Sequence, residues 1–167
     1  MARIYISIGS NIDAARNVRR AVAALCADFG PLALSPVYES EAVGFTGDNF
    51  LNLVAGADTA RPVAEVAARL HAMEDAQGRD RSGPRFSSRV IDLDLLLYDD
   101  LVLESPGLVL PREEILHNAF VLRPLADLAP DLVHPVAGRT MAELWADFDQ
   151  SSQRLWPVAI DLGQGAQ

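Results

Sequence analysis

The sequence predicts an α+β fold, in which helices pack on one or both faces of a mainly antiparallel sheet. Apolar residues repeat at the spacing of strands and helices in the order strand, helix, strand, strand, helix, strand. The chain has 167 residues, of which 50% are hydrophobic. That is enough for a buried core, and we expect residues 1–167 to form a single domain.

The first half of the chain contains the clearest elements. A strand is predicted at Arg3–Gly9, followed by a helix that Ser10 or Asn11 caps and that ends at Gly30. Residues 33–43 resemble a strand that enters a loop, and residues 50–59 a second full strand. A helix with proline in its first turn is expected at Pro62–Gln77.

The second half begins with the strand RVIDLDLLLYDD, Arg89–Asp100, and a short strand is expected at Leu101–Leu103. Two short helical pieces follow before residue 135, separated by turn signals that include Pro124. A last helix is predicted at Thr140–Phe148. The tail, residues 154–162, is expected to form an edge strand, and the final five residues to fray.

Composition excludes several classes of function. The net charge of −9 argues against a nucleic-acid binder, which needs a basic surface. No apolar run approaches membrane-spanning length and no signal peptide is recognisable, so we expect a cytoplasmic protein without a membrane partner. Cys26 is the single cysteine, which excludes a disulfide framework. All 14 basic residues are arginine, so guanidinium groups must bind any phosphate.

Two aspartates interrupt the apolar run of RVIDLDLLLYDD. Because residues i and i+2 of a strand share a face, Asp92 and Asp94 present neighbouring carboxylates, while Leu95 and Leu97 are expected on the opposite, core face. Two converging carboxylates suit Mg²⁺, whose other ligands are water and phosphate oxygens. Alternatively, the pair faces solvent or is neutralised by Arg89 and its neighbours.

An arginine-rich loop precedes these aspartates. It contains Arg79, Arg81 and Arg85, and Arg89 follows directly, so four of the 14 arginines lie close together. Such a run is usually a solvated turn. Next to a metal-type strand, however, it indicates polyphosphate handling, with the metal on one side and guanidinium groups on the other.

These residues belong to a longer pattern in the chain. It consists of IYISIGSN near the start, FLN at Phe50–Asn52, E-x4-R-x-R at Glu74–Arg81, R-x2-D-x-D at Arg89–Asp94 and AFVLRPLADLAPDLVHP at residues 119–135. In this order and spacing it resembles the 6-hydroxymethyl-7,8-dihydropterin pyrophosphokinase family. The resemblance implies a ferredoxin-like sandwich and an enzyme of folate biosynthesis. Such an enzyme transfers pyrophosphate from ATP to the pterin hydroxymethyl group and releases AMP.

The resemblance also implies ligands and site residues. Two Mg²⁺ ions and ATP are expected with a pterin alcohol as substrate, and we expect a monomer. The metal ligands are Asp92 and Asp94, which form the catalytic set with Arg81 and Arg89. The implied nucleotide contacts are Glu74, Arg79, Arg81, Arg89, Leu95 and Arg112. The implied pterin contacts are Ser40, Val43, Phe50, Asn52 and Phe120, of which each phenylalanine taken singly is also explained by core packing.

The chain departs from the family pattern in its second half. The arginine that usually precedes the Phe120 position by two residues is Asn118 here, and another family arginine aligns with Gly107. Phosphate contacts in this half must be supplied differently, by Arg112 or Arg123. The departures leave two other hypotheses open. One is a divergent paralogue that acts on another pterin, or a non-catalytic binder of pterin or nucleotide; the other is an acidic regulatory module.

Overall fold

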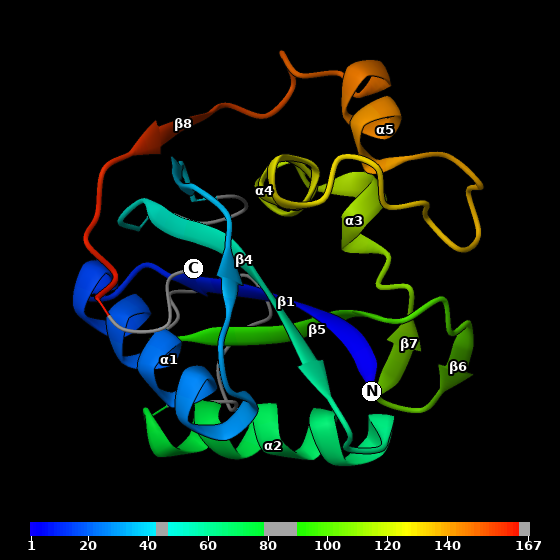
Figure 1. The fold of residues 1–167 in the computed structure, drawn as a ribbon. Helices are drawn as coiled ribbons and strands as arrows, with labels where there is room; N and C mark the ends of the chain where they lie inside the picture. Colours follow the sequence, from blue (N-terminus) through cyan, green and yellow to red (C-terminus); the bar gives the residue numbers. More distant parts are fainter. Residues whose placement is uncertain (43–46, 79–89, 164–167) are drawn as a thin grey trace.

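The fold places an antiparallel sheet between two groups of helices (Figure 1). The computed structural model describes residues 1–42, 47–78 and 90–163. The main sheet consists of β1 (Ala2–Ser10), β2 (Ala33–Leu34), β3 (Val37–Ser40), β4 (Phe50–Thr59), β5 (Asp92–Tyr98) and β8 (Leu155–Val158). A separate hairpin consists of β6 (Leu103–Ser105) and β7 (Leu108–Leu110). The helices are α1 (Ala14–Phe29), α2 (Val63–Ala76), α3 (Glu114–His117), α4 (Ala119–Leu128) and α5 (Met141–Asp147).

The sheet has the order β5-β1-β4-β3-β8, with β2 also paired to β4. All of these strand pairs are antiparallel. Helix α1 crosses from β1 to β3, and α2 crosses from β4 to β5, which gives the chain the β-α-β-β-α-β order of a ferredoxin-like sandwich. The predicted α+β fold class is therefore confirmed.

The two faces of the sheet carry separate hydrophobic clusters. On one face, Ile6 of β1 packs with Val22 of α1 and Leu70 of α2 in one cluster of buried residues. On the other face, Tyr5 belongs to a second cluster with Leu122 of α4. Figure 1 shows α1 and α2 below the sheet and α3, α4 and α5 above it. Burial on both faces explains why the strands at the centre of the sheet are almost continuously apolar.

A β-bulge in β5 changes which face its last residues occupy. Residues Asp92 to Leu95 pair regularly with β1, but the register shifts between Tyr5 and Ile6, so that Leu97 pairs with Tyr5 and Leu96 is the extra residue. Leu97 therefore packs in the cluster under α4. The prediction that it shares the core face of Leu95 is wrong, because simple alternation does not allow for an inserted residue.

The start of α1 differs from its prediction. The helix begins after Asp13, so Ser10 and Asn11 are not its caps. Ser10 is the last residue of β1, and the Asn11 side chain donates a hydrogen bond to the Asp48 carbonyl oxygen at 3.1 Å. Both residues are buried, so their polar groups need hydrogen-bond partners at the end of the strand and in the neighbouring loop.

Two predictions in the second half are also wrong. The short strand expected at Leu101–Leu103 begins at Leu103 and pairs within the β6–β7 hairpin, where Gly107 adopts a φ of 81° that glycine favours. Pro124 lies inside α4, and the two helical pieces separate at Asn118 instead. The buried apolar face of α4 outweighs the backbone hydrogen bond that proline removes.

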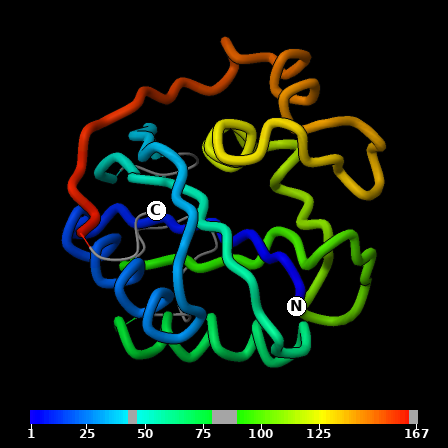
Figure 2. The backbone as a smooth tube through the Cα atoms, in the orientation of Figure 1, coloured from blue at the N-terminus to red at the C-terminus, as the bar shows by residue number. Residues whose placement is uncertain are grey.

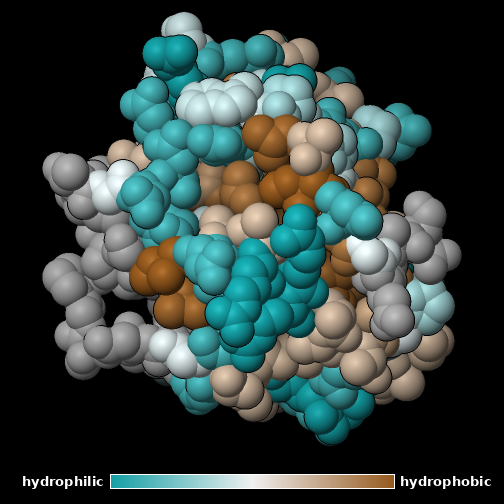
Figure 3. Space-filling view, turned by 90° about the vertical axis from the view of Figure 1, so that its left-hand side faces the viewer, coloured by the Kyte–Doolittle hydropathy of each residue, from teal (hydrophilic) through white to brown (hydrophobic). Residues whose placement is uncertain are grey.

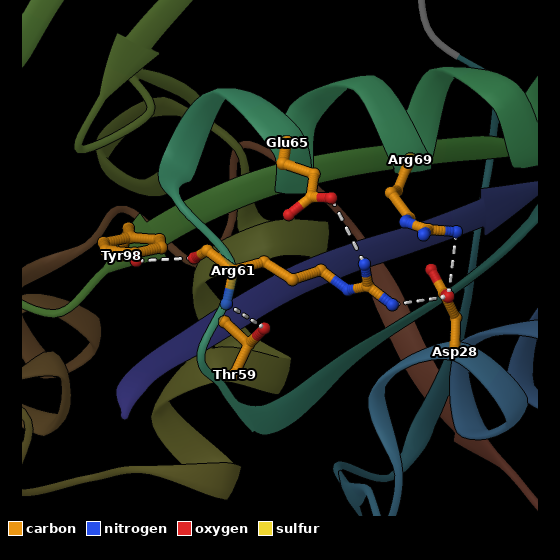
Figure 4. A network of polar contacts seen from close by, with 6 residues as sticks. All are labelled: Asp28, Thr59, Arg61, Glu65, Arg69 and Tyr98. Carbon is orange, nitrogen blue, oxygen red and sulfur yellow. Dashed lines mark hydrogen bonds and ion pairs between the residues drawn. The ribbon is translucent and has the colours of Figure 1, made fainter.

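A partly exposed ion-pair network joins the end of α1 to α2 and the residues before it (Figure 4). The Arg61 guanidinium pairs with Asp28 at 3.1 Å and with Glu65 at 3.4 Å, and Arg69 pairs with Asp28 at 3.2 Å. The Tyr98 hydroxyl donates a 2.7 Å hydrogen bond to the Arg61 carbonyl oxygen. The Asp28 side chain is only 16% exposed, so water solvates its negative charge poorly. Removing Arg61 or Arg69 would therefore leave this charge with a single ion-pair partner among the described residues and destabilise the fold.

The C-terminal segment returns to the sheet as an edge strand. β8 pairs with β3, so the predicted edge strand is confirmed, and Pro157 lies on it where no further strand needs its missing N–H. The chain then runs down to α1, where Arg19 donates to the Asp161 carbonyl oxygen at 2.8 Å (Figure 2). Figure 3, viewed from this side, shows mostly hydrophilic residues with hydrophobic ones near the centre. Within the described ranges, no helix has the length and apolar character to cross a bilayer.

His134 is a buried polar residue in the loop between α4 and α5, with an exposed fraction of 2%. Its Nδ1 atom accepts hydrogen bonds from the backbone N–H groups of Val136 at 3.2 Å and Ala137 at 3.0 Å. A protonated ring cannot accept these bonds, and burial lowers the pKa of His134. The folded state therefore holds the neutral ring.

We expect the free energy of unfolding to decrease as the pH falls below the ordinary histidine value of 6.5, because the unfolded chain then takes up a proton that folded His134 refuses. The contribution of His134 is fully present above that pH. In the variant His134→Asn the side-chain oxygen keeps an acceptor near the Nδ1 position without titrating. Urea unfolding between pH 5 and 8 should show a shallower pH dependence for the variant, and equal slopes would contradict the assignment.

Candidate functional site

A cavity of about 850 Å³ lies on the face of the sheet that α4 covers. Its floor is formed by residues from four neighbouring strands: Ser7, Gly9, Ser40, Phe50, Asn52, Asp92, Asp94 and Leu96. Residues 112–114 and 117–121, around α3 and the start of α4, line it from above. Residues 151–155, just before and at the start of β8, complete the wall. The cavity therefore joins parts of the chain that are far apart in sequence.

The aspartate pair lies side by side on the floor. Asp92 pairs with Gly9 and Asp94 with Ser7 across β1 and β5, so both face the cavity as the i, i+2 spacing predicts. Between them, Leu93 points into the core on the opposite face. Both aspartates are partly exposed and have interactions with other residues.

Among the described residues, Arg112 is the cation that meets this pair from above. Its guanidinium lies 3.4 Å from an Asp94 oxygen and 2.6 Å from a Glu114 oxygen, and its backbone N–H donates to the Leu96 carbonyl oxygen at 3.0 Å. Burial opposes the charged form, but Asp94, Glu114 and Asp92 outweigh it and raise the pKa of Arg112. The site thus contains a permanently charged guanidinium beside the carboxylates.

The other end of the floor presents an amide and an aromatic ring. Asn52 is buried, and its Nδ2 donates to the Ser40 hydroxyl oxygen at 3.3 Å. Gly9 makes room for it, because a Cβ at Gly9 would lie 2.7 Å from the Asn52 Oδ1 atom. Phe50 lines the cavity from β4 and Phe120 from α4. A flat polar heterocycle suits such a combination of aromatic walls and an amide that both donates and accepts.

A second, smaller cavity of about 260 Å³ shares Asp94 and Arg112 with the first. Glu74 and Leu95 also line it. The Glu74 side chain is buried, and its Oε2 atom accepts a 2.8 Å hydrogen bond from the Leu93 backbone N–H, which ties α2 to β5 between the two aspartates. The Leu95 side chain packs in the core under α1 and α2.

The structure thus brings most of the described sequence-predicted residues around two adjoining cavities. The main cavity gathers Ser40, Phe50, Asn52, Asp92, Asp94, Arg112 and Phe120, and the smaller one Glu74 and Leu95. The predictions at Val43, Arg79, Arg81 and Arg89 lie outside the described residues.

Gly9, Gln153 and Arg154 are among the cavity residues that the sequence prediction did not include. A glycine inside an apolar strand is a signal for close approach by another group, which would have identified Gly9. Gln153 connects the tail to the α3–α4 junction, since it accepts from the Ala119 N–H at 2.9 Å and donates to the His117 carbonyl oxygen at 2.8 Å. Only tertiary structure reveals that contact.

The donor set at the aspartate pair suits one kind of metal site. Within residues 1–42, 47–78 and 90–163, no cluster of three or more His, Cys, Asp or Glu side chains could enclose a metal ion. Mg²⁺, however, usually takes only one or two protein carboxylates and completes its octahedron with waters and substrate phosphates. Asp92 and Asp94 fit that chemistry, because both face an open cavity.

An α+β sandwich that gathers a carboxylate pair, arginine and an aromatic–amide pocket fits a protein that holds a phosphorylated ligand beside a flat heterocycle. A sequence model of the 7,8-dihydro-6-hydroxymethylpterin-pyrophosphokinase (HPPK) family matches residues 5–130. The chain belongs to this family, which confirms the resemblance of its motifs.

Relatives from several organisms agree with the family. A 2-amino-4-hydroxy-6-hydroxymethyldihydropteridine pyrophosphokinase from Pseudomonas aeruginosa is 38% identical, over 86% of this chain and 90% of the relative. One of the same name from Methylorubrum extorquens is 39% identical, over 90% and 96%. The folic acid synthesis protein fol1 of Schizosaccharomyces pombe is 35% identical over 91% of this chain, but the chain spans only 21% of that protein.

Solved structures show the same fold in a larger protein. Plasmodium falciparum HPPK-DHPS, in a crystal structure with pterin and p-hydroxybenzoate, superposes with a TM-score of 0.67 at 14% identity. The match covers 87% of this chain and 42% of that one, so this chain spans less than half of the fused protein. At this identity the likeness concerns the fold alone.

We expect Gly9→Ala to lower the free energy of unfolding by about 1–3 kcal/mol, because its methyl group would overlap the buried Asn52 amide. Urea unfolding of Gly9→Ala, Asn52→Ala and the double variant measures the coupling. In the Asn52→Ala background the added methyl group should cost far less, since its obstacle is gone. Strictly additive effects would mean that Gly9 serves some other purpose.

Proposed function

We propose that this chain transfers a pyrophosphoryl group from ATP to the hydroxymethyl group of 6-hydroxymethyl-7,8-dihydropterin, with Mg²⁺, and releases AMP in folate biosynthesis. The observation that carries the proposal is that one cavity contains both the aspartate pair and the Asn52 pocket. Relatives named for this pyrophosphokinase activity match the chain at 38% and 39% identity over nearly their whole length. Pyrophosphokinase activity follows from the family, and the dependence on Mg²⁺ and the roles of the residues are proposed.

In the proposed reaction, the hydroxymethyl oxygen of the pterin forms a bond to the β-phosphorus of ATP. The bond between that phosphorus and the oxygen bridging to the α-phosphate breaks, AMP leaves with that oxygen, and the hydroxyl proton passes to water. Little covalent chemistry is required of the protein, so alignment and charge compensation dominate. When bound, Mg²⁺ would neutralise phosphate charge as it develops.

The chain's own residues supply the alignment. Asn52 would hydrogen-bond the polar edge of the pterin, with its amide held by Ser40. Phe50 and Phe120 would hold the ring faces, and the backbone at Ser40 would border the slot. These contacts would orient the hydroxymethyl group toward the phosphates that Mg²⁺ would hold at Asp92.

The nucleotide would occupy the second cavity. It adjoins the first at Asp94 and Arg112, so a ligand that extends through both would pass its phosphates over the aspartates. Asp92 and Asp94 would hold the two Mg²⁺ ions with the phosphates. Arg112 would contact a phosphate oxygen, and Glu74 would fix the β5 backbone below. Arg81 and Arg89 would contact phosphates and Arg79 would lie near the nucleotide; all three lie outside the described residues.

We further propose that residues 1–167 act as one domain, as a monomer and in the cytoplasm. A chain with one cysteine forms no internal disulfide, so its folding does not require an oxidising compartment. Sedimentation analysis of the purified chain would report its oligomeric state directly.

The proposal predicts AMP formation when the purified chain is supplied with ATP, Mg²⁺ and 6-hydroxymethyl-7,8-dihydropterin. Asp94→Ala should lower the rate by about 100-fold or more, because it removes a group that compensates transition-state charge. Asp100→Ala is the matched control, since Asp100 is an exposed aspartate in the turn after β5 and lines neither cavity. If wild type forms no AMP but binds the pterin tightly in calorimetry, the chain is a binding protein and the proposed reaction is wrong.

Metal dependence is tested separately by titrating Mg²⁺ into protein treated with a chelator. AMP formation should be absent without the metal and return with it, while Asp92→Asn should need more Mg²⁺ for half-maximal rate because it loses one anionic ligand. Full activity in excess chelator would exclude the metal part of the proposal.

A further inference from the structure

Arg154 is a cation on the cavity wall that the known motifs of the chain do not include. It lies directly before β8, between Gln153 and Leu155, and all three residues line the main cavity. Among the described residues of this cavity, Arg112 and Arg154 are the arginines. They approach the cavity from different parts of the chain.

The backbone on both sides of Arg154 is held in place. Gln153 bridges the α3–α4 junction through hydrogen bonds of 2.9 Å from the Ala119 N–H and 2.8 Å to the His117 carbonyl oxygen. Leu155 pairs with Ser40 of β3. Arg154 is therefore anchored at its Cα although its side chain is exposed. Little backbone entropy remains to be lost when its guanidinium binds a ligand.

Arg154 is a positive charge in a cavity lining that is otherwise mostly acidic. Carboxylates dominate the described lining: Glu41, Asp92, Asp94, Glu113 and Glu114. Arg112 is engaged by Asp94 and Glu114. Arg154, by contrast, makes no ion pair or hydrogen bond through its side chain among the described residues. An anchored guanidinium with no ion pair among the described residues is suited to an anionic ligand group, whereas Arg112 is already engaged by two carboxylates.

The position of Arg154 indicates which anionic group it meets. Its neighbour Leu155 pairs with Ser40, which holds Asn52 at the end of the cavity assigned to the pterin. The nucleotide end lies at the second cavity beside Arg112, and Arg154 does not line that cavity. Of the three phosphates of ATP, those nearest the pterin end are the two that are transferred.

We propose that Arg154 is a further substrate-binding residue whose guanidinium binds the pyrophosphoryl group as it passes from ATP to the pterin alcohol. The inference rests on the proposed function, because it takes the two ligands and their order along the cavity from it. Arg154 compensates the charge of the β- and γ-phosphates from the part of the wall formed by residues 151–155. It makes no contact with the adenosine or the α-phosphate.

Calorimetric titration separates these contacts. The ligands are α,β-methylene-ATP with Mg²⁺, which carries all three phosphorus groups, and AMP, which lacks the two that are transferred. We expect Arg154→Gln to weaken binding of the analogue about tenfold, the effect of losing one charge-assisted contact, and to leave AMP binding unchanged. Arg154→Lys, which keeps the charge but not the two-pronged geometry, should lie between. Arg20→Gln is the control, since it removes the same charge from an exposed site on α1 that lines neither cavity.

Each outcome decides the inference. Analogue binding by Arg154→Gln as tight as by wild type overturns it, as does an equal loss for AMP and the analogue. A raised KM for the pterin alcohol with unchanged analogue affinity would assign Arg154 to the pterin ring instead, which also overturns it. If wild type forms no AMP, the proposed reaction fails, while the comparison of AMP with the analogue still decides the phosphate contact. A wild type that does not bind the analogue overturns both.

Discussion

The carboxylate pair on β5 is the feature on which the rest of the site depends. Two negative charges at Asp92 and Asp94 repel each other, and partial burial raises the cost of both. The strand tolerates them because its other face, at Leu93 and Leu95, is anchored in the core. Arg112 compensates the charge from above, and Glu74 accepts the Leu93 N–H from below. Divalent cations bound with a polyphosphate complete this compensation in the proposed function, which accounts for an aspartate pair inside an apolar strand.

One strand serves both the cavity and the core because of its bulge. Before Leu96, the cavity face of β5 carries aspartates, whereas after it the same face carries Leu97, which packs with Tyr5 under α4. Leu96 itself lies at the boundary, since it lines the cavity and belongs to the buried cluster. Because of the bulge, the strand changes from polar cavity residues to buried core residues at Leu96. Bulges often occur beside functional sites.

Regular patterns in the sequence were sufficient for the fold and for the centre of the site. Alternation in RVIDLDLLLYDD placed Asp92 and Asp94 on one face, and the family motifs gathered Asn52 and Phe120 in the same cavity. Alternation failed at Leu97 because a bulge depends on the partner strand, not on the local sequence. Helical spacing missed the position of Pro124 inside α4, where tertiary packing overrides local preference. The positions of Gln153 and Arg154 could not be predicted from the sequence. They depend on the hydrogen bonds that Gln153 makes with Ala119 and His117, which lie 34 and 36 residues earlier in the chain.

The central claim is that Asp92 and Asp94 hold the metal-bound phosphates of ATP directly beside a pterin held by Asn52. A crystal structure with Mg²⁺, α,β-methylene-ATP and 6-hydroxymethyl-7,8-dihydropterin tests it most directly. We predict Mg²⁺ on both aspartates, the pterin ring against Phe120, and its hydroxymethyl oxygen within about 3.5 Å of the β-phosphorus. A triphosphate or metal bound away from Asp92 and Asp94, or a pterin outside the Asn52 pocket, would contradict the account.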